Sequence, residues 1–116
     1  MNGLYSIHVS LGDGRSGKGS GVLVLQDGNI FGGDAFLFYV GRYEIQGTKM
    51  KGEVVIDQHT PSPGQLPLFG GKVVGIGFAG AVGAEVIELN GTALVGNTSQ
   101  IFRATLKKLA TQTDRA

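Results

Sequence analysis

The chain has 116 residues and a formal net charge of +1, from ten Lys and Arg against nine Asp and Glu. This balance gives no electrostatic reason to expect a nucleic acid or an anionic membrane as a partner. Because the chain has no cysteine, a disulfide framework, a thiolate nucleophile and a cysteine-based metal site are excluded. The length suits one domain with one core, and the 41% hydrophobic content is not that of a disordered chain. The 21 glycines make up about 18% of the residues, against a typical ~7%, and suit short strands joined by tight turns.

The first predicted element is a strand over residues 3–11. Tyr5, Ile7 and Val9 alternate with polar residues there, and a period of two is typical of a half-buried strand. The first ten residues lack a basic segment followed by an apolar one, so we expect no signal peptide. No stretch is long and apolar enough to span a bilayer, and we therefore expect a cytoplasmic protein.

The glycine-rich segment that follows, residues 12–21, contains two patterns typical of phosphate-binding loops. Its glycines match G-x-G-x-x-G, and together with Lys18 they match most of G-x-x-x-x-G-K. Both motifs need a helix directly after the glycines, so that the helix N-terminus faces the phosphate. A β-branched and aliphatic run, residues 22–25, follows instead. We therefore interpret the segment as a flexible hairpin loop and not as a nucleotide site.

Three strands are predicted next, after a hairpin turn at Asp27-Gly28. Residues 29–34 form the first of them, residues 35–45 the second and residues 47–57, after a turn at Gln46-Gly47, the third. Between the first two, Asp34 is expected to accept hydrogen bonds from backbone N–H groups at a sharp bend.

A Pro-rich segment, residues 58–71, holds all three prolines and is the one long connection that we expect. Long connections often cover a site or bind a partner. Short strands are predicted after it in the stretches KVVGIGFAG, AEVIELNG and TALVG, and a last strand in SQIFRATLKKL. Residues 110–116 read as a flexible C-terminal tail.

The pattern predicts seven to nine short strands and no convincing helix. Short connections make neighbouring strands antiparallel, and closure into a barrel removes the exposed sheet edges. We therefore expect an all-β fold in a single domain over residues 1–109. The architecture that fits this length is an eight-stranded antiparallel up-and-down barrel, with a two-sheet sandwich as the alternative.

The N-terminal half resembles the GrlR family, negative regulators of type III secretion gene expression in Gram-negative pathogens. The resemblance lies in the pattern D-G-x-I-x-G-G-D followed by Y-x-G, which begins at Asp27 and ends at Gly41, and in G-L-Y-S-I at residues 3–7. A G-x-V-x-I strand follows, so that the resemblance covers about residues 3–57. It implies a bacterial, dimeric, lipocalin-like barrel that regulates transcription by binding an activator protein rather than DNA.

The family binds its activator through an acidic surface loop directly after the Y-x-G strand. The matching segment of this chain is EIQGT at residues 44–48, which has one acid where the family's type member has four. The resemblance therefore implies the fold and a regulatory role, but not the same partner.

One strand of the predicted barrel is apolar on both faces. If Tyr39 faces inward, then Phe36, Phe38, Val40 and Arg42 face outward. Monomers rarely leave large apolar groups together on a surface, so we expect these residues to form a homodimer interface or a contact with another protein.

The barrel interior is the alternative site. Aromatic and aliphatic residues on the inward faces are candidate contacts for a small apolar or lipid-like ligand, and they are equally candidates for core residues that fill the barrel. They are Tyr5, Tyr39, Tyr43, Met50 and Phe78.

No set of residues supports catalysis or metal binding. His8 and His59 are the only histidines, and neither has a carboxylate at ligand spacing. Nothing in the sequence places a serine beside either of them as a nucleophile. We therefore expect a non-enzymatic binding or regulatory module without cofactor or metal, which acts by protein–protein contact. The alternative is a small hydrophobic-ligand or lipid-binding barrel.

Overall fold

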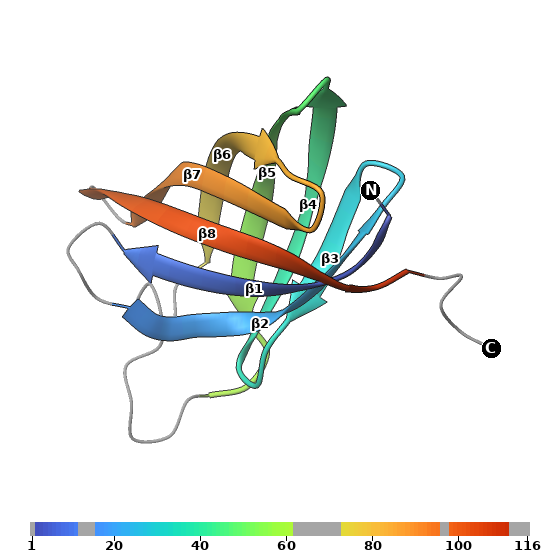
Figure 1. Ribbon diagram of the computed structural model, residues 1–116. Coiled ribbons are helices and arrows are strands. Elements are labelled where there is room, and N and C mark those ends of the chain that lie inside the picture. Colours follow the sequence, from blue (N-terminus) through green and yellow to red (C-terminus); the bar gives the residue numbers. More distant parts are fainter. Residues whose placement is uncertain (1, 12–15, 62–72, 96–97, 112–116) are drawn as a thin grey trace.

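The computed structural model describes residues 2–11, 16–61, 73–95 and 98–111. These residues form eight antiparallel strands that close into one up-and-down barrel, in which each strand pairs with its neighbours in sequence and the last pairs with the first (Figure 1). The predicted barrel is thereby confirmed, and the sandwich is excluded. The strands are β1 (Gly3–Leu11), β2 (Ser16–Gln26), β3 (Asn29–Gly33), β4 (Leu37–Gln46), β5 (Lys49–Gln58), β6 (Val74–Val82), β7 (Val86–Val95) and β8 (Thr98–Ala110).

The turn between β2 and β3 shows why this sequence makes tight hairpins. Asp27 and Gly28 have φ angles of 53° and 85°, the left-handed values that a two-residue hairpin loop requires. Asp27 also forms two hydrogen bonds with Asn2, the residue before β1. The backbone N–H of Asp27 donates to Asn2 Oδ1 at 3.0 Å, and Asn2 Nδ2 donates to Asp27 Oδ1 at 3.1 Å. The loop therefore holds the entry into β1 as well as the β2–β3 register.

Inside the barrel, large side chains alternate with glycine from one strand to the next. One inward row runs through cross-strand partners on five consecutive strands, β4 to β8: Tyr43, Gly52, Phe78, Gly91 and Phe102. A Cβ added at Gly52 would lie 2.7 Å from Phe78 Cζ, so the ring occupies the space that a side chain would take. Alternation of this kind lets a narrow barrel hold three large rings in one layer.

The structure corrects three predicted boundaries. β2 begins at Ser16, so residues 16–21 are not loop but strand, paired with β1 as Gly19 with Val9 and Gly21 with Ile7. β7 runs without a break through Asn90-Gly91, where the sequence suggested two strands. β8 extends to Ala110, which pairs with Leu4, one residue beyond the end of the predicted last strand.

Candidate functional site

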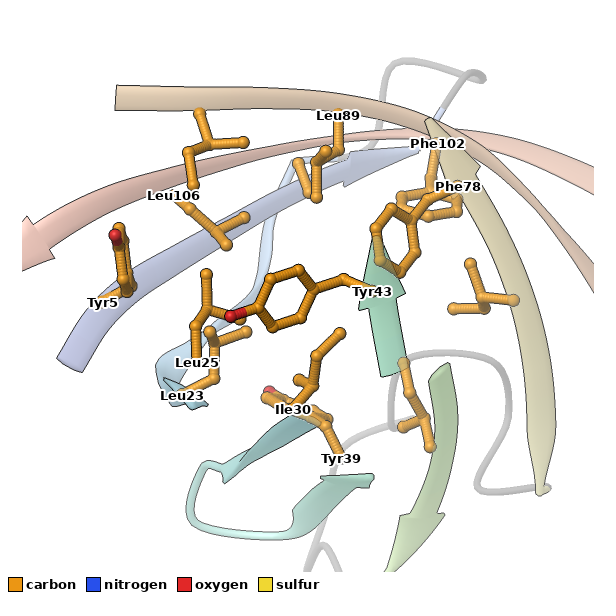
Figure 2. Close-up of a cluster of buried hydrophobic side chains, with 14 of the residues drawn as sticks. Tyr5, Leu23, Leu25, Ile30, Tyr39, Tyr43, Phe78, Leu89, Phe102 and Leu106 are labelled. Carbon is orange, nitrogen blue, oxygen red and sulfur yellow. The ribbon is translucent and has the colours of Figure 1, made fainter. Parts of the chain in front are cut away.

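All five candidate interior residues point into the barrel. Figure 2 shows Tyr5, Tyr39, Tyr43 and Phe78 within one cluster of buried side chains, in which the Tyr43 ring points toward Leu25. The exposed fraction of Tyr39, Tyr43 and Phe78 is 8% each, that of Tyr5 is 3% and that of Met50 is 1%. Their predicted orientation is confirmed, and they belong to one continuous apolar core.

The space left between these side chains is small. A cavity of about 60 Å³ lies in the interior, with aliphatic and aromatic walls from all eight strands, among them Ile7, Leu25, Ile56 and Leu89. Pockets that hold drug-sized ligands measure about 300–1,000 Å³. The described part of the barrel interior is therefore largely filled by its own side chains.

Asp34 organises the bend between β3 and β4, as predicted. Its Oδ1 accepts hydrogen bonds from the backbone N–H groups of Phe36 and Leu37, both at 2.8 Å, and its Oδ2 accepts one from the Tyr39 hydroxyl at 2.9 Å. Burial, followed by the Asp34 charge and this hydrogen bond, raises the pKa of Tyr39 far above that of a free tyrosine. Every contact of the carboxylate thus has a structural role at this bend.

His59 lies at the β3–β4 bend. His59 Nε2 lies 2.9 Å from the carbonyl oxygen of Asp34, and the backbone N–H of His59 donates to the carbonyl of Phe36 at 2.8 Å. These contacts fasten the end of β5 to the β3–β4 bend. Within the described part of the chain, no three His, Asp or Glu side chains lie together as a metal-binding group.

The outer surface carries an apolar row that crosses five strands. Cross-strand partners line up as Val24 on β2, Phe31 on β3, Val40 on β4, Val55 on β5 and Gly75 on β6. The exposed fractions of Phe31, Val40 and Val55 are 52%, 45% and 48%. We call the outer surface of β3 to β6 around this row the apolar face.

The row next to it carries one cation and one anion. Asn29, Arg42, Glu53 and Gly77 are cross-strand partners on β3 to β6. Arg42 and Glu53 are direct neighbours on β4 and β5. Among the described residues, however, neither side chain forms an ion pair.

A shallow groove of about 560 Å³ follows the apolar face. Its floor includes Gly75 and Gly77, whose missing side chains leave open space: a Cβ at either position would meet no atom within 4 Å. Phe31, Val40 and Val55 line it, together with Arg42 and Glu53. The apolar face therefore combines a ridge, formed by Phe31, Val40 and Val55, with a hollow at Gly75 and Gly77.

Of the four residues predicted for this surface, Val40 and Arg42 lie at its centre. Phe38 is 39% exposed but lies toward the β3–β4 bend, opposite Asp57. The predicted outward orientation of Phe36 is wrong: this residue precedes β4, is half-buried and packs against the core. The backbone hydrogen bonds of the bend with His59 and Thr60 turn the chain there, so the strand alternation does not extend back to it.

Sequence reasoning missed the rest of the face, namely Phe31, Val55, Glu53 and the two β6 glycines. These residues come together through the register between strands, which the pattern within one strand does not reveal. Two further predictions lie wholly or partly outside the described residues, the hairpin tip at 12–15 and most of the Pro-rich segment 58–71. Strand β2 begins within the glycine-rich segment and continues to Gln26, so the described residues do not have the helix that a phosphate-binding loop needs after its glycines.

No protein-family model and no curated protein matches this chain. What stands of the resemblance to the GrlR family is the architecture, an eight-stranded antiparallel closed barrel. The segment that would correspond to the acidic loop is the turn between β4 and β5. Beside this turn, Glu44 Oε2 forms an exposed ion pair with Lys51 Nζ at 4.0 Å. Among the described residues there is no helix with the length and apolarity that a membrane crossing requires.

Proposed function

We propose that this protein is a non-enzymatic binding module of the cytoplasm whose apolar face contacts another protein chain. The observation that carries the proposal is the row of Phe31, Val40 and Val55, three large apolar side chains that are each about half exposed and lie side by side. Water-exposed apolar groups in such a patch are stabilised when a partner covers them.

The small volume of the interior cavity favours the outer surface, rather than the barrel lumen, as the binding site. A cavity of about 60 Å³ is smaller than the one of about 150 Å³ that admits benzene in an engineered protein core. A hydrophobic-ligand or lipid carrier is therefore the weaker candidate.

A regulatory role like that of the GrlR family is the narrower form of the proposal. It rests on the D-G-x-I-x-G-G-D and Y-x-G pattern together with the barrel. The β4–β5 turn region has only one acidic residue, so an activator protein would have to bind to a different surface. The apolar face is the surface that we propose for this contact.

The test is affinity capture with matched surface variants. Val40→Lys places a charge in the centre of the apolar face, whereas Ile101→Lys alters a more exposed apolar residue on β8, away from that face (67% against 45% exposed). We expect the wild type and Ile101→Lys to retain the same protein, a second copy of this chain included, and Val40→Lys to lose it. Equal retention by Val40→Lys would contradict the proposed surface.

A further inference from the structure

We propose that the partner of the apolar face is a second copy of this chain, bound about a two-fold axis that runs parallel to the strands between β4 and β5. This inference rests on the proposed function and names the partner for the same surface. It follows from the order of residues across the strands, which makes the face complementary to itself.

A two-fold axis in the plane of contact exchanges the two sides of the face. With the axis between β4 and β5, strand β4 lies opposite the partner's β5, and β3 lies opposite the partner's β6. Because the axis is parallel to the strands, each cross-strand row stays at its own height and meets the same row of the partner.

In the apolar row, this operation sets the largest side chain against a glycine and the two valines against each other. Phe31 comes opposite the partner's Gly75, while Val40 comes opposite the partner's Val55. Phe31 is the largest exposed group of the row, and Gly75 lies where a Cβ would meet nothing within 4 Å. The ridge on one side of the axis therefore has a hollow to enter on the other.

In the adjacent row, the same operation pairs opposite charges. Arg42 comes opposite the partner's Glu53, and Glu53 opposite the partner's Arg42. Both side chains are exposed and without an ion pair among the described residues of their own chain, so they are available to a partner. Asn29 comes opposite the partner's Gly77, again a larger group against an open position.

The expected contact is small because two convex barrels touch over few strands. A face of four strands, spaced about 4.8 Å apart, is roughly 15–20 Å wide. This places the contact at the lower end of specific interfaces, about 1,000–1,200 Å² in total, for which we expect a dissociation constant on the order of micromolar.

The first test separates filling of the hollow from damage to the barrel. Gly75→Val puts a side chain into open space on the outside of β6, so the variant should fold and its melting temperature should not fall. By sedimentation velocity at about 10–100 μM, we expect self-association at least about tenfold weaker than in the wild type. Ile101→Val is the matched control on β8 and should associate as the wild type does.

The second test uses the charges. Arg42→Glu and Glu53→Arg should each weaken self-association about tenfold or more, because like charges then face each other across the axis. An equimolar mixture of the two variants should form a heterodimer, since one protomer then presents two anions and the other two cations. Only a contact between copies of this chain, in this register, predicts recovery on mixing.

Two outcomes would overturn the inference in distinguishable ways. A wild type that stays monomeric up to about 100 μM would show that the partner is not a second copy, and the proposed function would survive with another protein on the same face. A dimer that is unaffected by Gly75→Val, Arg42→Glu and Val40→Lys would show that copies meet elsewhere. That result would overturn both the inference and the evidence for the apolar face.

Discussion

At the scale of single residues, Asp34 is the polar group on which the β3–β4 bend depends. Its carboxylate accepts hydrogen bonds from two backbone N–H groups and from the Tyr39 hydroxyl. Asp34→Ala leaves all three donors without this acceptor, and we expect it to lower the free energy of unfolding by about 1–3 kcal/mol in urea denaturation.

Two companion variants sharpen that measurement. Tyr39→Phe removes one of the three hydrogen bonds and should cost about 1 kcal/mol. Asp57→Ala, in which the lost carboxylate accepts from the N–H of the next residue, should cost about 0.5 kcal/mol or less. A cost for Asp34→Ala no larger than that for Asp57→Ala would contradict the role assigned to the bend.

The Tyr39 hydroxyl also predicts how stability depends on pH. Burial and the neighbouring Asp34 raise its pKa in the folded protein, whereas in the unfolded chain it ionises near pH 10. Above about pH 10 the unfolded chain releases this proton and the folded protein retains it, so stability falls as the pH rises; below about pH 10 both states hold the proton and the contribution is constant.

This dependence is measured by comparing urea denaturation of the wild type and Tyr39→Phe between about pH 9 and 11.5. We expect the wild type to lose stability more steeply than the variant above about pH 10, because the two proteins differ only in the Tyr39 hydroxyl. Parallel curves would mean that Tyr39 ionises as freely in the fold as in the unfolded chain.

At the scale of strands, the inward glycines of β5 and β7 are packing positions. A Cβ at Gly91 would lie 2.5 Å from two ring atoms of Phe102 and 2.6 Å from the carbonyl oxygen of Gly77. We expect Gly91→Ala to destabilise the barrel by about 1–3 kcal/mol, as overpacked cores do. Gly77→Ala, on the open outer side of β6, should instead be neutral or stabilise by about 0.5 kcal/mol. Equal effects of the two substitutions in urea denaturation would contradict this account.

The strands also show how far the sequence alone predicts this fold. Alternation predicts which side chains of β1, β4 and β5 face inward, and Asp27-Gly28 predicts the hairpin, because these signals are local. Asn90-Gly91 is locally a turn signal, yet β7 continues through it because the ring of Phe102, from another strand, occupies the place of a side chain at Gly91. Such a contact between strands is invisible in a local pattern.

The apolar face could be predicted only in part for the same reason. The exposure of Val40 follows from alternation within β4. Its alignment with Phe31 and Val55 follows only once the registers across two hairpins are known. The position of Gly75 beside Val55 depends on a register that is set across the long segment between β5 and β6, whose length does not determine it.

At the scale of the whole molecule, a filled interior and an uncovered apolar face predict where small and large partners bind. We expect no uptake of a fluorescent fatty acid at micromolar concentrations, because the cavity of about 60 Å³ is a fraction of the volume that such a chain occupies. Saturable uptake that Phe78→Trp, a larger inward ring, abolishes would show that the lumen opens to admit a ligand.

The most direct test of the central claim, that this barrel acts through its outer face and not through its lumen, is native mass spectrometry of freshly purified protein at about 50 μM, repeated under denaturing conditions. We predict a population of dimers whose mass is twice that of the chain, with no additional mass that is lost on denaturation. A monomer that carries a small molecule, released when the barrel unfolds, would contradict the account and identify the protein as a carrier.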